Sequence, residues 1–118
     1  MSLGFNQHTQ TDSIMFDSDV EAGTAVDYSG TPTNVAVYGV TAEQCVSGKL
    51  GLVVTAGPCQ IQAANASVAK GSEIQIDANG RAVILAAGTP VGMARENGVA
   101  AVSSKYKLVG IDLYAQKQ

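Results

Sequence analysis

The fold is indicated most clearly by residues 73–85, which read EIQIDANGRAVIL. Apolar and polar residues alternate over residues 73–77, as in a strand that buries one face. The dipeptide Asn79-Gly80 follows, and this pair favours a tight reversal of the chain. Apolar residues resume directly after it. The stretch therefore predicts a β-hairpin whose two strands flank residues 78–80.

Strand-like patterns extend outward from this hairpin in both directions. Cys59, Ile61 and Ala63 alternate with glutamines, which is typical of a half-buried strand. Residues 50–55 form a continuous apolar segment, as expected for a strand that is buried on both faces. Further strand-like runs occupy residues 35–40, 90–94 and 108–114.

The composition supports an all-β chain of one domain. The 118 residues are enough for one ordinary domain but too few for two. Hydrophobic residues make up 46%, mostly small or β-branched, and 13 glycines indicate frequent turns. No long helical periodicity is present. We expect a small β-barrel or a β-sandwich.

One spacing occurs twice in the chain: an apolar residue, glycine three positions later, and an apolar residue three positions after that. Residues 20–26 read VEAGTAV and residues 68–74 read VAKGSEI. Glycine at the third step permits the positive φ that a tight turn needs. The two segments are either a weak internal repeat or two unrelated turns.

Residues 1–19 differ from the rest, because a polar run with little pattern separates two short apolar groups. We expect an extended N-terminal arm over residues 1–19, followed by a single β domain over residues 20–118. Large apolar side chains are poorly placed in free solvent, so the arm is expected to dock on a neighbouring subunit. The alternative is a frayed terminus. The apolar residues expected to make the contact are Leu3, Phe5, Ile14, Met15 and Phe16.

Charge and targeting patterns narrow the function classes. The net charge is −3 and the seven basic residues are spread along the chain, which argues against nucleic-acid binding. No apolar run approaches the length of a membrane span. The first residues lack the basic and apolar regions of a secretory signal, which favours synthesis in the cytoplasm. In that reducing compartment Cys45 and Cys59 are expected to be free thiols, with a disulfide as the alternative if their strands are adjacent.

The sequence offers no constellation for catalysis. The single histidine, His8, lies in the expected arm, where nothing would fix it beside a nucleophile. There is no CxxC motif or histidine cluster, so neither a metal site nor a cofactor is expected. Charged residues are only 14%, and such a surface suits burial against another protein. We therefore expect a binding protein that is not an enzyme.

Residues 20–114 resemble a family of capsid cement, or head decoration, proteins of tailed bacteriophages. The segments that carry the resemblance are residues 20–26, residues 68–83 and PVGMA at residues 90–94. The resemblance implies a β-barrel or β-tulip that binds the outside of the phage head and clamps adjacent subunits of the major capsid protein. It also implies a homo-oligomer, with a trimer favoured over a dimer, and an N-terminal arm that becomes ordered on the capsid.

On this resemblance the location would be the exterior of the capsid, after assembly in the host cytoplasm. A second hypothesis is a module of the virion surface that binds a receptor or a glycan. Sugar sites use exposed aromatic rings, and tryptophan is absent, so tyrosines would have to serve. The tyrosines of the chain are Tyr28, Tyr38, Tyr106 and Tyr114.

Overall fold

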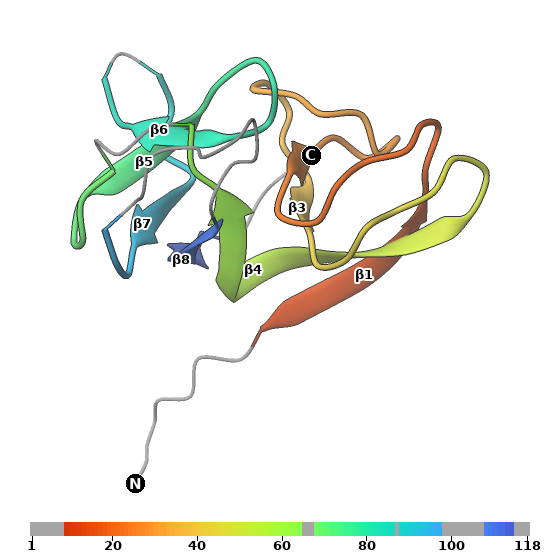
Figure 1. The fold of residues 1–118 in the computed structure, drawn as a ribbon, viewed down its shortest axis with the longest axis horizontal. Helices are drawn as coiled ribbons and strands as arrows, with labels where there is room; N and C mark the ends of the chain where they lie inside the picture. Colours follow the sequence, from red (N-terminus) through yellow and green to blue (C-terminus); the bar gives the residue numbers. More distant parts are fainter. Residues whose placement is uncertain (1–8, 65–67, 87, 98–107, 115–118) are drawn as a thin grey trace, which may run out of the picture.

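The structure of the chain, a computed structural model, describes residues 9–64, 68–86, 88–97 and 108–114. Within these ranges the chain forms one antiparallel sheet that curls into a half-barrel (Figure 1). The strands are β1 Gln10–Met15, β2 Ala25–Val26, β3 Gly39–Thr41, β4 Leu50–Gln62, β5 Glu73–Ile76, β6 Ala82–Ile84, β7 Gly92–Ala94 and β8 Leu108–Leu113. The all-β prediction is confirmed, in its barrel-like form. No helix in the described part could cross a membrane.

Strand β4 connects the two sides of the molecule. Residues 50–56 pair with β1 on one edge and residues 53–54 with β3 on the other, whereas residues 57–62 pair with β8. Gly57 has a φ of +98° and stands beside Pro58 where β4 changes partners. The two strands expected over residues 50–55 and 59–63 are thus one bent strand, which Figure 1 shows passing from the side of β1 and β3 to that of β5–β8.

The sheet consists of two units with the same topology, residues 10–56 and residues 57–113. The first unit has the strand order β1-β4-β3-β2, and the second repeats it as β4-β8-β7-β5. Paired residues also correspond one to one between the units: Val26–Gly39 with Ile74–Gly92, Thr41–Val53 with Ala94–Ile111, and Asp12–Val53 with Cys59–Ile111. The repeated spacing in the sequence is therefore a structural repeat.

The turn glycines occupy equivalent places in the two units. Gly23 donates its N–H to Thr41 O at 2.8 Å, and Gly71 donates its N–H to Ala94 O at 2.9 Å. Their φ angles are +80° and +85°, in the region that side chains with a Cβ rarely adopt. The predicted need for glycine at this step is confirmed in both units.

Each unit also contains the same aspartate-capped turn. Asp27 Oδ1 accepts the N–H groups of Ser29 and Thr31, and Asp77 Oδ1 accepts those of Asn79 and Arg81. The second of these turns joins β5 to β6, with Gln75 opposite Val83, so the predicted hairpin is confirmed. The reversal is longer than a two-residue Asn-Gly turn, because Gly80 alone adopts a positive φ and its N–H bonds back to the carbonyl of Asp77.

The predicted arm is wrong for residues 10–16, which form β1 and its continuation in the sheet. Ile14 and Phe16 are 4% and 1% exposed and belong to a core with Val20, Val26, Cys45 and Val53. Phe16 donates its N–H to Lys49 O at 3.1 Å. These apolar residues avoid solvent by packing inside their own domain, so the domain begins before residue 20. Leu3 and Phe5 lie outside the described residues.

Candidate functional site

Three exposed apolar side chains gather beside strand β1. Met15, Tyr28 and Leu50 are 53%, 61% and 65% exposed, and we call them the Leu50 surface. They line an open groove of about 440 Å³. The remaining lining residues are Ser13, Ile14, Asp17 and Ser29. Of the predicted contact residues within the described part, Met15 is therefore the one whose side chain is exposed.

The same groove borders an open strand edge. In the described part of the chain β1 pairs only with β4. Because Phe16 turns its N–H toward Lys49, the alternation of a strand turns the N–H of Met15 to the opposite, open edge. The N–H of Ser13 bonds to the Asp12 carboxylate at 2.8 Å. An open edge of this kind accepts main-chain hydrogen bonds from a partner.

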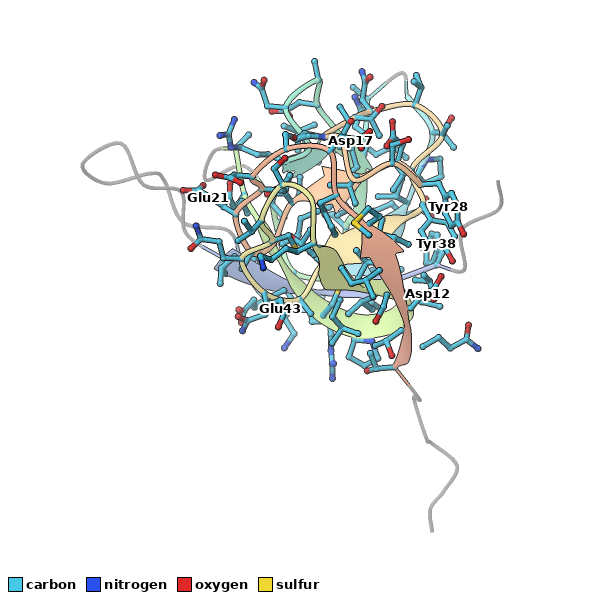
Figure 2. All side chains as sticks on the ribbon, turned by 90° about the vertical axis from the view of Figure 1, so that its right-hand side faces the viewer. Asp12, Asp17, Glu21, Tyr28, Tyr38 and Glu43 are labelled. Atoms are coloured by element: carbon cyan, nitrogen blue, oxygen red, sulfur yellow. The ribbon has the colours of Figure 1, made fainter. Side chains whose placement is uncertain are left out.

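A pair of tyrosines lies close to this edge. The rings of Tyr28 and Tyr38 meet edge to face, with their centroids 4.9 Å apart. Tyr38 donates its hydroxyl to Asp12 Oδ2 at 2.5 Å, and Figure 2 shows the three side chains together. This hydrogen bond raises the pKa of Tyr38, and desolvation adds to the effect. Tyr38 is thus held in place, while the Tyr28 ring remains available for contact.

The other tyrosines do not join this pair. Tyr114 donates its hydroxyl to Glu73 Oε2 at 2.9 Å, on the second unit. Tyr106 lies outside the described residues. Sequence reasoning weighed the four tyrosines alike, because the contact between Tyr28 and Tyr38 depends on a reversal of the chain that their spacing does not reveal.

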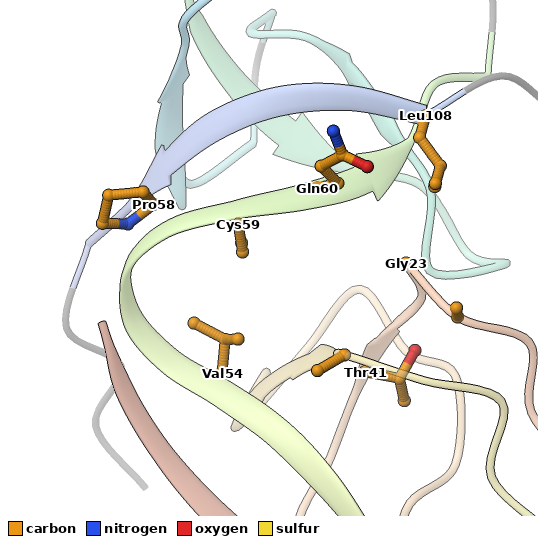
Figure 3. A pocket seen from close by; sticks show the side chains of 9 residues that line it. Gly23, Thr41, Val54, Pro58, Cys59, Gln60 and Leu108 are labelled. Carbon is orange, nitrogen blue, oxygen red and sulfur yellow. The ribbon is translucent and has the colours of Figure 1, made fainter.

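A cleft of about 210 Å³ opens inside the bend of β4, between the two units. Val54 and Cys59 project into it from the two arms of β4, with Gly23 and Leu108 on its far side (Figure 3). Burial, with a smaller contribution from Asp112, raises the pKa of the Cys59 thiol to about 12. A thiol of this kind remains protonated near neutral pH and is a poor nucleophile. Cys45 and Cys59 are both free, as expected.

The acidic residues of the first unit serve as hydrogen-bond acceptors for neighbouring loops. Asp19 Oδ1 accepts the N–H of Ser47 at 2.9 Å, and Glu21 Oε1 accepts from the Gln62 side chain at 3.1 Å. Within the described ranges no three histidine, cysteine or acidic residues converge in a way that would hold a metal ion. His8 falls outside those ranges, and the absence of enzymatic activity remains a prediction. What the described surface offers is apolar contact and an open strand edge.

No protein-family model matches the chain, and no curated protein matches its sequence. Among solved structures, the fold is similar to the crystal structure of the head fiber gp8.5 N base in bacteriophage phi29. The sequences are 19% identical, the TM-score is 0.68, and the match covers 94% of this chain and 98% of that chain. The two chains therefore share a fold over nearly their whole lengths.

Proposed function

We propose that this chain is a structural protein of a bacteriophage head surface, and that it binds the major capsid protein on the outside of the shell as a decoration or cement protein. The observation that carries the proposal is the fold shared with a head fiber base over 94% of this chain and 98% of the other. Because so little of either chain is left out of the match, the whole chain, and not one part of it, is the unit that would be placed on a head.

The surface chemistry supports a static contact. The Leu50 surface exposes three large side chains beside an unpaired strand edge, and such a combination fits a protein partner. Burial raises the pKa of the Cys59 thiol, so this side chain stays protonated and unreactive near neutral pH. We therefore propose a role without enzymatic activity, cofactor or bound metal, and without a nucleic-acid or membrane partner.

The physical effect on the shell would be mass action. A protein that binds the assembled shell but not free capsid subunits stabilises the shell in proportion to its binding free energy. Many symmetric copies multiply a modest contact. We propose a homo-oligomer for this reason, with a trimer favoured and a dimer as the alternative, located on the capsid exterior after assembly in the host cytoplasm.

The N-terminal segment remains the proposed contact with the capsid, in a shorter form. Residues 10–16 are part of the sheet, so the contact would be made by Leu3 and Phe5, and Met15 is the exposed predicted contact residue within β1. A segment that continues β1 could extend onto the capsid protein and place alternate side chains in pockets.

Binding to purified heads that lack the protein tests this function. The full chain is expected to sediment with the heads and to raise the temperature at which they release their contents. Deletion of residues 2–8 leaves β1 intact, so the variant should fold but bind heads more weakly. The substitution Val35→Ser, at a side chain that is 69% exposed, is the matched control and should bind normally. Full-length protein that stays in the supernatant would contradict the proposal.

A second candidate, a virion surface module for a receptor or glycan, is favoured by one observation. Tyr28 is 61% exposed, and its ring packs edge to face against the ring of Tyr38, which holds it in place. Exposed aromatic rings stack on the apolar faces of sugars. Binding on a glycan array that is lost in Tyr28→Ala would support this candidate; an array without any signal would remove it.

A further inference from the structure

Besides the hydrogen bonds from the Gln62 side chain to Glu21 and Ala22, the contact between the two units within one chain has three well-defined parts. Gln62 donates its N–H to Gly23 O at 2.7 Å, so an edge of the second unit is hydrogen-bonded to the first. The Leu108 side chain covers Gly23, where an added Cβ would collide with it. The turn that ends in Gly80 accepts the N–H of Ala25 at 2.8 Å. The repeat therefore contains one complete example of how a second unit docks on a first.

The first unit carries a backbone N–H and a leucine at the positions equivalent to those of the docked face of the second. Met15 lies opposite Leu50 in the β1–β4 pair, just as Gln62 lies opposite Leu108 in the β4–β8 pair. The N–H of Met15 points to the open edge of β1, as the N–H of Gln62 points to Gly23. Met15 is therefore the counterpart of Gln62, and Leu50 is the counterpart of Leu108.

The second unit carries the same groups as the receiving face of the first. Gly71 is the counterpart of Gly23, with the same turn conformation and the same hydrogen bond to the following strand. A Cβ built at Gly71 meets no described atom within 4 Å, whereas at Gly23 that space is filled by Leu108. The receiving face is thus present twice in the chain, and among the described residues nothing covers it at Gly71.

We propose that the Leu50 surface of one copy docks at Gly71 of a second copy, repeating between chains the contact that joins the two units within a chain. Leu50 would cover Gly71 as Leu108 covers Gly23, and the N–H of Met15 would donate to the carbonyl of Gly71. Leu108, which is docked within the chain, is 44% exposed, whereas its undocked counterpart Leu50 is 65% exposed. Docking on a second copy would cover Leu50 in the same way.

Charge supports a second copy as the occupant. The positions of Ala22 and Ala42, which line the internal cleft, are taken in the second unit by Lys70 and Arg95. The position of Cys59, on the docked face, is taken in the first unit by Asp12. A neutral contact within the chain thus becomes a contact between basic and acidic faces across two chains. Arg95 already lies 3.8 Å from Asp112, so Lys70 is the freer of the two cations to respond.

The contact joins two different faces, so it is heterologous. Such contacts close into rings or continue as chains, whereas a twofold dimer needs one face to meet itself. This inference rests on the proposed function, which includes a homo-oligomer, and it names the two surfaces that would join the copies. It favours a ring such as a trimer over a twofold dimer. The tests of this contact use the isolated protein, whereas the proposed function is tested by binding to phage heads. Either test can therefore fail while the other succeeds.

The first test is the mass of the full chain in solution by light scattering at increasing concentration. Species larger than a dimer are expected at concentrations up to about 1 mM, which detects even weak association. Leu50→Asp should shift the protein to monomer with an unchanged circular dichroism spectrum, and Lys70→Glu should weaken association in a salt-dependent way. Val35→Asp, at an exposed residue that does not line the groove, should associate normally. A wild-type monomer at the highest concentration, or association unaffected by Leu50→Asp, would overturn the proposal.

The second test fixes the pairing of faces by disulfide cross-linking. Leu50→Cys and Lys70→Cys are prepared as separate proteins and oxidised alone or mixed; the wild type, with its two native thiols, is the control. The proposal expects a cross-linked dimer in the mixture only. A dimer formed by Leu50→Cys alone would show that the Leu50 surfaces meet each other, and a mixture without cross-links would exclude the contact; either result contradicts the proposal.

Discussion

The two units of this chain have the same strand order and register, but they fill their interiors differently. After β1 the first unit places Phe16, whereas the corresponding position after Gln62 in the second unit is Ala63, and both side chains are buried. The units share three backbone features: a glycine turn, an aspartate-capped turn, and a glycine that lies close to the backbone of the neighbouring strand. The comparison indicates that backbone conformation restricts the sequence at a few positions, while the core varies as long as its volume is filled.

The largest expected effect tests whether the core of the first unit depends on β1. Phe16→Ala should lower the free energy of unfolding by about 3–5 kcal/mol, the usual cost of emptying a buried phenylalanine site. Met15→Ala, at the exposed neighbour, should change it by less than about 0.5 kcal/mol. Urea denaturation measures both. A small loss for Phe16→Ala would restore the interpretation of residues 10–16 as a detachable arm.

The next prediction tests the equivalence of the units directly. A Cβ at Gly39 would lie 2.6 Å from Val54 O, and one at Gly92 would lie 2.5 Å from Asp112 O. Gly39→Ala and Gly92→Ala should therefore each cost about 2 kcal/mol, since the strands must separate to admit the methyl group. Gly110→Ala, whose Cβ would come no nearer than 3.6 Å to any described atom, is the control. Clearly unequal losses at Gly39 and Gly92 would show that the resemblance between the units is only topological.

A smaller effect is expected at the aspartate-capped turns. Asp27→Ala and Asp77→Ala each remove one acceptor of two backbone hydrogen bonds, which should cost about 1–2 kcal/mol of stability. The substitutions to asparagine keep an oxygen in place and should recover most of the loss. Thermal unfolding would compare the four variants, and an asparagine variant as unstable as its alanine counterpart would argue against the capping role.

The last prediction concerns reactivity at the cleft between the units. Burial raises the pKa of Cys59 from 9.0 to about 12, so its neutral form is favoured by folding. The associated stability is present below pH 9.0 and is lost as the pH rises toward 12. The folded protein should therefore show very slow alkylation of Cys59 at mildly alkaline pH, while the urea-unfolded chain reacts quickly. Mass spectrometry of the two states measures this, and rapid labelling of the folded state would show that burial does not protect the Cys59 thiol.

Sequence reasoning succeeded where the pattern is local. The alternation over residues 73–85 predicted the β5–β6 hairpin, and the repeated glycine spacing marked Gly23 and Gly71 in advance. It failed at β1, because the polar residues of that strand show no alternation and its partner, β4, lies some forty residues away. The arrangement of the Leu50 surface could not be foreseen either. The apolar run at residues 50–55 predicts a strand buried on both faces, and only the fold shows that Leu50 stands exposed at the open end of a repeat.

The most direct test of the central claim is the number of copies of this chain in purified phage particles, measured by quantitative mass spectrometry against the major capsid protein. A role as a structural protein of the head surface predicts that the chain is present in particles and remains with isolated heads. A ratio near one copy per capsid subunit would establish shell-wide decoration, and a lower, fixed ratio would place the protein at selected sites, as expected for a fiber base. Absence of the chain from particles would contradict the account.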